Sequence, residues 1–290
     1  MRPPYWDGAG FSNDEGAMDQ MRIGIVAPST PIERRLADRA TGIAAAAFPG
    51  IELFFHPQCF FIHGHFAGDD ATRADAFVEV ANDPALDAIW FARGGYGSNR
   101  VADDILARLK SPAKAKAYLG YSDAGFLMAA LYGAGYKQLY HGPMVQDLAR
   151  RDGEAAILRA LAWLTEKDRS TLEPNCARGE KAAAFNITVL SHLLGTDLEP
   201  PLAGHVLMLE EVSEHLYRID RSLFHILSTP TVRRVAGIRL GRCSDVPVND
   251  RHFGSTEEEI IRHWCERFDI PYLGRADIGH DSANKVVPFG

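Results

Sequence analysis

The stretch Lys116-Ala-Tyr-Leu-Gly-Tyr-Ser-Asp-Ala-Gly-Phe-Leu-Met-Ala-Ala-Leu131 places a serine between two apolar runs. Residues 117–119 are strand-like, and residues 126–131 form an apolar segment of helical length. Small residues two positions before and after Ser122 let the chain turn sharply and expose the hydroxyl, as in a nucleophile elbow. The N–H groups at the helix start then face a developing oxyanion. The alternative is that Ser122 caps the helix with Asp123 in its first turn, and because Ala124 replaces the second glycine of the usual motif, this stretch alone leaves both open.

The composition is typical of a globular protein with room for two domains. The chain has 290 residues, of which 46% are hydrophobic and 24% charged. Its net charge of −7 argues against a nucleic-acid surface, which needs a basic face. No apolar run is long enough to span a membrane. We therefore expect neither nucleic acid nor a membrane as a partner.

The cysteines and the first twenty residues indicate a cytoplasmic location. The cysteines form no C-x-x-C pair, which indicates a reducing compartment without a disulfide framework or structural zinc: Cys59, Cys176, Cys243 and Cys265. Residues 1–20 are acidic and lack the apolar region of a signal peptide. We interpret them as a flexible extension ahead of a fold that starts at Met21.

Strand and helix signals alternate from residue 22 to residue 141. Strands are expected at 22–27, 51–55, 88–92, 117–119 and 138–141, with helices at 32–47, 70–82, 98–109 and 126–131. This order predicts a parallel sheet with helices on both faces, whose ligands bind beyond the carboxyl ends of the strands. Four segments follow strand ends and should meet at one rim: Pro28-Ser29, Arg93-Gly94-Gly95, Ser122 and His141-Gly142-Pro143.

The second half of the chain predicts a smaller α/β domain. A charged helix over 147–167 completes the first domain, residues 21–167, and a linker follows over 168–180. Within 181–290 we expect strands at 205–210 and 235–240, helices at 187–194 and 217–227, and a last helix opened by a capping box at Ser255-Thr-Glu-Glu258. The predicted fold class is α/β, with an N-terminal parallel-sheet domain and a smaller C-terminal α/β domain.

The turn Arg93-Gly-Gly-Tyr-Gly97 lies between a strand and a helix, where a phosphate-binding loop is found in other proteins. It lacks the lysine of G-x-x-x-x-G-K-[ST] and does not read G-x-G-x-x-G. Its glycines instead allow a backbone N–H to approach Ser122 closely. Arg93 has the fork geometry to bind a substrate carboxylate, and a surface or interdomain salt bridge is its alternative role.

A nucleophilic serine needs a base, and the base needs an orienting acid. The chain has 11 histidines, so the sequence leaves the base open between His141, at a strand end, and His280, in a glycine-flanked loop. Glu210 ends a strand and is a candidate acid, although its acidic neighbours also fit a solvated turn. A metal site is a further alternative, because three histidines lie close together in the sequence: His56, His63 and His65. The lack of a nearby carboxylate at helical spacing argues against it.

Several stretches together carry a family resemblance. In the first half they are Ile25-Val-Ala-Pro-Ser29, Gly64-His-Phe-Ala-Gly-Asp-Asp70, Ile89-Trp-Phe-Ala-Arg-Gly-Gly-Tyr-Gly97, Gly120-Tyr-Ser-Asp123 and His141-Gly-Pro-Met144. In the second half they are Leu209-Glu-Glu-Val-Ser-Glu214, Tyr217-Arg-Ile-Asp-Arg221 and Gly279-His280. In this order they resemble the LD-carboxypeptidase family, serine peptidases that trim bacterial cell-wall peptides and include microcin-immunity peptidases as a branch. The resemblance runs from about residue 22 to the end.

The resemblance implies a Ser-His-Glu triad, with Ser122 as nucleophile, His280 as base and Glu210 orienting the base. It implies an oxyanion hole formed by the backbone N–H groups of Asp123 and of Gly95 in the Gly94-Gly95 turn. It further implies a Rossmann-like N-terminal domain and a smaller C-terminal α/β domain, with the active site between them. No metal and no cofactor is expected.

The resemblance also implies a small peptide substrate, a muropeptide, from which a terminal D-amino acid such as D-Ala is released. We expect Arg93, Tyr96 and His141 to contact this substrate. The chain has Ala184-Phe185-Asn186 where the family usually has Gly-Gly-Asn, and it lacks the longer insertion of the microcin-immunity branch. A related amidase or esterase acting on a peptide or aminoacyl conjugate and a non-catalytic peptide binder stay open as alternatives, as does a homodimer.

Overall fold

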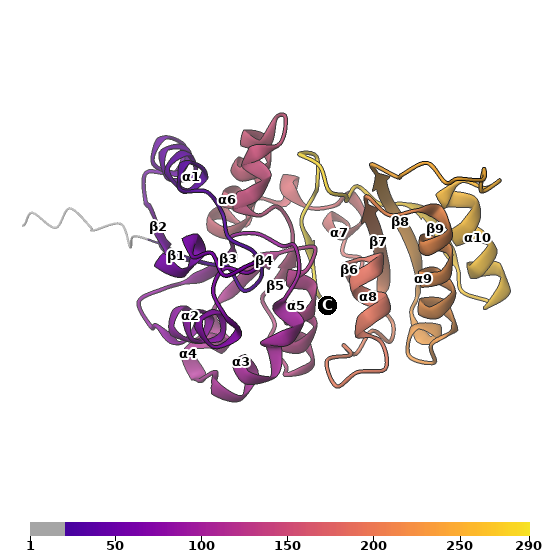
Figure 1. The fold of residues 1–290 in the computed structure, drawn as a ribbon, viewed down its shortest axis with the longest axis horizontal. Coiled ribbons are helices and arrows are strands. Elements are labelled where there is room, and N and C mark those ends of the chain that lie inside the picture. Colours follow the sequence, from indigo (N-terminus) through magenta and orange to yellow (C-terminus); the bar gives the residue numbers. More distant parts are fainter. Residues whose placement is uncertain (1–20) are drawn as a thin grey trace, which may run out of the picture.

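The computed structural model describes residues 21–290, so the extension predicted over 1–20 lies outside the described residues. Two α/β halves lie side by side, and the chain ends between them (Figure 1). The predicted α/β fold class with two sheets is confirmed. Within residues 21–290, the helices fall short of the length and apolar content that crossing a bilayer requires.

The first half is built on a six-stranded sheet with the order β10-β5-β4-β3-β1-β2. Its strands are β1 (Met21–Val26), β2 (Ile51–Phe55), β3 (Ala88–Phe91), β4 (Ala117–Gly120), β5 (Leu139–His141) and β10 (Val287–Pro288). The first five strands pair in parallel, as the strand and helix alternation predicted. Only β10, from the far end of the chain, joins antiparallel.

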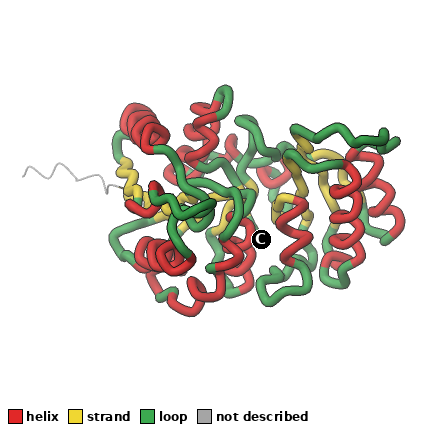
Figure 2. Tube along the Cα trace, in the orientation of Figure 1, coloured by secondary structure: helices red, strands yellow, loops and turns green. Residues whose placement is uncertain are grey.

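Helices cover both faces of this sheet, which explains why its strands β3 and β4 are apolar and buried along their whole length (Figure 2). They are α1 (Arg34–Ala47), α2 (Asp70–Asn82), α3 (Ala102–Arg108), α4 (Ser111–Ala115), α5 (Ala124–Gly133) and α6 (Gly153–Glu166). Successive residues of a strand point to opposite faces. Ile89 and Tyr118 accordingly pack into the core with α2, α3 and α5, whereas Trp90 and Leu119 pack into the core with α1 and α6.

Short helices connect these elements. The 3-10 helices are η1 (Pro57–Phe60), η2 (Ser98–Arg100), η3 (Val145–Ala149), η4 (Arg169–Thr171) and η5 (Val232–Arg234), and the linker region forms α7 (Pro174–Ala177). The helix expected over 98–109 is therefore η2 followed by α3. The helix expected over 147–167 begins only at Gly153, because η3 precedes it.

The second half carries a four-stranded parallel sheet with the order β6-β7-β8-β9. Its elements are β6 (Ala182–Asn186), α8 (Ile187–Leu193), β7 (Val206–Val212), α9 (Leu216–Ser228), β8 (Gly237–Ser244), α10 (Glu257–Arg267) and β9 (Tyr272–Arg275). The capping box of the last helix lies one residue later than predicted: Thr256 is the N-cap and Glu259 its reciprocal partner.

The two halves share one core. Side chains of α5 and α8 belong to the same buried cluster, which continues into α9 and α10. The last residues lie between the sheets, because β10 pairs with β5 and the Gly290 N–H donates to the Ala182 carbonyl at 3.0 Å. The domain limits predicted at 167 and 181 stay a prediction, and the structure adds that the C-terminal segment returns to the first sheet.

Candidate active site

Ser122 lies between β4 and α5 in a left-handed backbone conformation with φ of +58°. Non-glycine residues rarely adopt this conformation, and such strained positions cluster at functional sites. A serine at this point of a strand–turn–helix unit is the geometry of a nucleophile elbow. Its partly exposed side chain faces a pocket rather than capping α5, which begins after Asp123 without a side-chain cap.

The glycine turn after β3 packs directly against Ser122. A Cβ atom placed on Gly94 would lie 3.0 Å from both Cβ and Oγ of Ser122. Gly95 has φ of +104°, and a Cβ there would come within 2.7 Å of Thr30. The Thr30 hydroxyl holds the turn by donating to the Gly94 carbonyl at 2.6 Å. The turn therefore needs glycine at position 95, and a side chain at position 94 would crowd Ser122, which is why the sequence signal was informative.

Asp123 ties three strand-end loops together through its side chain. Its Oδ2 accepts from the Ser29 hydroxyl at 2.5 Å and from the Ser98 N–H at 2.9 Å. Within residues 21–290, the backbone N–H groups of Asp123 and Gly95 donate to no other group. Both N–H groups are thus available to an oxygen atom at Ser122, the arrangement that an oxyanion hole requires.

The His280 ring contacts a buried carboxylate. Nδ1 of His280 lies 2.5 Å from Oε2 of Glu210, and the side chains are 7% and 0% exposed. Glu210 lies on β7, where the pairing register with β8 shifts between Leu209 and Glu211. Bulges of this kind commonly redirect a side chain next to a functional site. With Nδ1 bonded to the carboxylate, Nε2 of His280 is the nitrogen free to accept a proton.

The pKa of His280 is raised above the ordinary histidine value. Burial lowers the pKa of this imidazole, but the charge of Glu210 and its hydrogen bond outweigh burial. The Tyr121 ring, 4.8 Å from the His280 ring between centroids, packs beside it. The pair therefore stabilises an imidazolium in a largely dry site.

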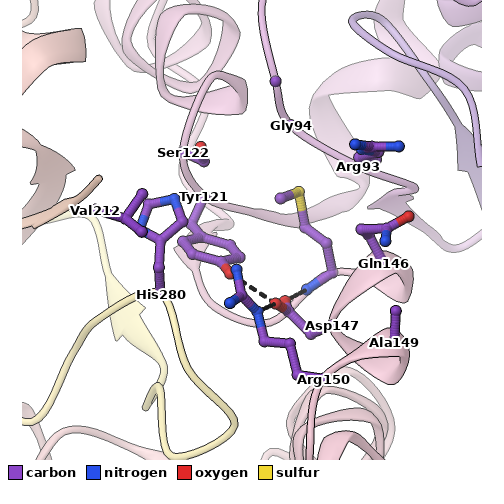
Figure 3. A pocket seen from close by; sticks show the side chains of 12 residues that line it. Arg93, Gly94, Tyr121, Ser122, Gln146, Asp147, Ala149, Arg150, Val212 and His280 are labelled. Carbon is purple, nitrogen blue, oxygen red and sulfur yellow. Dashed lines mark hydrogen bonds and ion pairs between the residues drawn. The ribbon is translucent and has the colours of Figure 1, made fainter. Parts of the chain in front are cut away.

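One pocket of about 480 Å³ is lined by Ser122 and His280 together with Arg93, Gly94 and Gly95 (Figure 3). No hydrogen bond joins the Ser122 hydroxyl to His280 in this part of the structure, although both face the same space. The elements that supply these residues come from both sheets. The pocket therefore brings together a serine hydroxyl, an imidazole with a carboxylate behind it, and unoccupied backbone N–H groups.

Family models match most of the chain. The model of the LD-carboxypeptidase N-terminal domain matches residues 23–142, and that of the LD-carboxypeptidase C-terminal domain matches residues 182–290. The chain belongs to the LD-carboxypeptidase family. Family membership makes it a serine-type carboxypeptidase, a hydrolase.

Relatives and solved structures agree with this assignment. A Synechocystis sp. protein named as a carboxypeptidase is 31% identical, with 93% of this chain and 89% of the relative covered. The murein tetrapeptide carboxypeptidase of Pseudomonas aeruginosa is 26% identical, with 93% and 91% covered. The structure of muramoyltetrapeptide carboxypeptidase from Oxalobacter formigenes matches with a TM-score of 0.76 at 23% identity, covering 93% of each chain. The microcin C7 self immunity protein MccF shares the fold with a TM-score of 0.76 at 18% identity, covering 94% and 92%.

Two residues expected to contact the substrate do not line the pocket of Ser122 and His280. Tyr96 is 47% exposed and packs near the His65 and Phe66 rings, beyond the glycine turn. His141 is 1% exposed because it ends β5, an interior strand of the sheet, and its ring packs against the Tyr121 ring. Burial lowers the pKa of His141 to about 4, so the ring is neutral near neutral pH. His141 is thus placed to support the site from behind, whereas Arg93 does face the pocket.

A buried network behind the pocket was missed by sequence reasoning. Nε2 of His141 lies 3.2 Å from Oδ1 of Asn284, and the same oxygen accepts from the Gly279 N–H at 3.2 Å. Asn284 is 0% exposed and sits four residues after His280. The loop that carries His280 is therefore fixed to the end of β5, next to the strand that precedes Ser122. No local sequence signal links positions so far apart.

A second network lines the pocket floor. The buried Asp147 accepts from the Tyr121 hydroxyl at 2.7 Å and from Nε of Arg150 at 2.8 Å. Sequence reasoning gave these residues no role. The available signal was their position just after a strand end on the predicted rim.

The histidines considered for a metal lie apart from the pocket. His56 is 3.4 Å from Glu79, and His65 packs on Phe66. Across residues 21–290, no three histidine, cysteine or acidic side chains gather at ligand distance.

Proposed function

We propose that this enzyme hydrolyses an L,D-peptide bond of murein peptides and releases a terminal D-amino acid such as D-Ala. The observation that carries the proposal is the pocket that the strained Ser122 lines together with His280, whose ring is backed by the buried Glu210. The substrate class is supported by relatives named for murein peptides, in Bacillus subtilis and Pseudomonas aeruginosa. Unpaired cysteines support a cytoplasmic location, where such peptides are recycled.

In the proposed mechanism, Oγ of Ser122 attacks the scissile carbonyl carbon while Nε2 of His280 takes the hydroxyl proton. The carbonyl oxygen becomes an oxyanion and accepts from the N–H groups of Gly95 and Asp123. Glu210 holds the proton-bearing Nδ1 and stabilises the imidazolium. The hydrogen bond between Ser122 and His280 is expected to tighten when substrate enters, as is common for catalytic pairs.

The tetrahedral intermediate then collapses. The bond from carbon to nitrogen breaks, and His280 returns its proton to the leaving amine, which departs as the free amino acid. Water enters, gives a proton to His280 and attacks the acyl-serine. Collapse of the second intermediate returns that proton to Ser122 and releases the shortened peptide. Arg93 is proposed as a further substrate contact from the pocket wall.

The test is a substrate panel with two enzymes, wild type and Ser122→Ala. Peptides ending in an L,D bond, a D,D bond and an L,L bond are compared with an aminoacyl sulfamoyl nucleoside. We expect wild type to prefer the L,D peptide, and Ser122→Ala to lose about 10⁴- to 10⁶-fold in kcat with an unchanged Tm. A preference for the nucleoside conjugate would favour an amidase of the kind the shared MccF fold allows.

A serine-reactive phosphonate separates catalysis from mere binding. An activated Ser122 forms a covalent adduct with the probe, and Ser122→Ala does not. A wild-type protein that binds the peptides but takes up no probe would contradict the proposal and support a peptide-binding protein.

A further inference from the structure

Arg150 follows η3 and lines the pocket together with Ser122 and His280. Its side chain is 37% exposed, so neighbouring residues cover most of it while a ligand in the pocket can still reach it. A carboxypeptidase must recognise the free carboxylate at the end of its substrate. Apart from the histidine, the pocket wall holds two cationic side chains, Arg93 and Arg150.

A buried carboxylate fixes one edge of the Arg150 guanidinium. Nε of Arg150 donates to Oδ1 of Asp147 at 2.8 Å. Asp147 is 4% exposed and is itself held by the Tyr121 hydroxyl at 2.7 Å and by the Met144 N–H at 2.8 Å. The anchor uses only the Nε edge of the fork, so the arginine is oriented before a ligand arrives.

The other edge of the guanidinium is open to a ligand. Within residues 21–290, the side chain of Arg150 forms its hydrogen bond through Nε, and Nη1 and Nη2 form none. A planar fork with its outer N–H groups free matches the two oxygens of a carboxylate.

Arg150 lies near the base, and Arg93 does not. The positive charge of Arg150 acts on the His280 imidazole and lowers its pKa, against the larger effect of Glu210. In Figure 3 the Arg150 guanidinium reaches toward Tyr121 and His280, whereas Arg93 lies across the pocket beside Gln146. Nη1 of Arg93 donates to the Pro31 carbonyl at 3.1 Å, which directs this side chain toward the 31–33 loop.

We propose that Arg150 binds the α-carboxylate of the residue that is released and thereby limits cleavage to the last peptide bond. The inference rests on the proposed function. In that reaction His280 protonates the scissile nitrogen, and the carboxylate carbon lies two bonds from this nitrogen. The group that binds the carboxylate must therefore lie next to His280, as Arg150 does. This assigns the terminal carboxylate to Arg150 rather than to Arg93, whose contact then belongs to another part of the substrate.

The experiment compares two peptides that end in the same L,D bond, one with a free terminal carboxylate and one with a terminal carboxamide. kcat/KM is measured for wild type, Arg150→Gln, Arg93→Gln and the matched control Arg151→Gln. Arg151 is adjacent and carries the same charge, but its side chain is 96% exposed. Phosphonate labelling of Ser122 verifies that each variant keeps its active site.

We expect wild type to favour the acid over the amide by about 10- to 100-fold, the range of a charged hydrogen-bonded pair. Arg150→Gln should lose this factor on the acid and almost nothing on the amide, so that the acid-to-amide ratio falls to about 1. Arg151→Gln should keep the wild-type ratio.

An unchanged ratio in Arg150→Gln, with the acid still hydrolysed by wild type, would overturn the role of Arg150 and leave the peptidase function standing. Collapse of the ratio in Arg93→Gln instead would also overturn it. If wild type hydrolysed neither peptide while Ser122 still took up the phosphonate, the proposed function itself would fail, and the assignment of Arg150 with it.

Discussion

At the scale of single residues, the site depends on two histidines with opposite environments. The pKa of His280 is raised by Glu210 despite burial, whereas burial lowers the pKa of His141 to about 4. His280 is therefore the ring that can take up a proton, whereas His141 stays neutral near neutral pH. Sequence patterns alone could not show which of the two is the base, because a strand end, as at His141, and a glycine-flanked loop, as at His280, are both common places for a functional residue.

The raised pKa of His280 predicts the pH dependence of catalysis. The base must be neutral, so kcat/KM should rise with pH through the His280 pKa, above the ordinary value of about 6.5. Glu210→Gln should move this acidic limb to lower pH and reduce kcat by about 10²- to 10⁴-fold, with a smaller change in KM. Stability follows the usual linkage: the pair contributes most below the unfolded pKa, and the contribution is lost as pH rises through the folded pKa. An acidic limb that stays in place in Glu210→Gln would show that another group orients the base.

The glycine turn predicts a second residue-scale effect. Gly94→Ala introduces a Cβ 3.0 Å from the Ser122 hydroxyl, a contact tighter than most real ones, and Ser122 must shift by a few tenths of an ångström. Because catalytic geometry tolerates such shifts poorly, kcat should fall by about 10- to 100-fold while Tm changes little. Gly133→Ala, whose Cβ would meet nothing within 4 Å, is the matched control and should keep full activity. Equal activity of the two variants would contradict the close packing of the turn.

At the scale of elements, the sequence predicted those helices and strands that short local patterns of apolar and turn-forming residues determine. The strands β1 to β5 and the rim residues at their ends followed from apolar runs and from glycine and serine positions. Strand β6 was missed because Ala182, Ala183 and Ala184 carry no strand signal, and β10 because it has two residues, one of them proline. The sequence singled out Glu210 because it ends a strand, but its acidic neighbours left a solvated turn as the alternative. In the structure Glu211 is occupied by Asn186 and by Thr188, which leaves Glu210 to the histidine.

The loop between β9 and β10 predicts a positioning effect. Oδ1 of Asn284 holds the Gly279 N–H and faces His141, so this amide fixes the loop that presents His280. Asn284→Ala should lower kcat by about tenfold or more with little change in KM, since geometry rather than binding is disturbed. Asn284→Asp keeps the acceptor oxygen and should have a higher kcat than Asn284→Ala. This recovery tests whether Asn284 acts through its hydrogen bonds rather than only by filling space. A rise in KM at constant kcat would instead place Asn284 in substrate binding.

At the scale of the whole molecule, the residues of the proposed triad come from two halves that share one core. The cluster around α5 continues into α8 and α9, and the chain end lies between the sheets. The prediction of two domains and a linker came from composition shifts along the chain. Such shifts mark where segments are connected covalently and cannot show whether the two halves pack against each other. With so much shared apolar surface, the halves are expected to unfold in one cooperative transition.

Phe289 offers the sharpest test of that shared core. Its ring is 4% exposed and contacts Tyr132 of α5 and Phe185 of β6, at centroid distances of 5.8 and 5.2 Å. Phe289→Ala should therefore cost about 3–5 kcal/mol in the free energy of unfolding, and both sheets should be lost together. The same segment carries β10 and follows the His280 loop. We therefore also expect a lower kcat for the variant, even at temperatures below its Tm. The control is Phe224→Ala, which removes the same ring from a side chain that is 48% exposed. It should lower the free energy of unfolding and kcat much less. If calorimetry of the Phe289 variant resolved two transitions, with phosphonate labelling of Ser122 surviving the first, the halves would be independent domains and the C-terminal segment would not hold the site together.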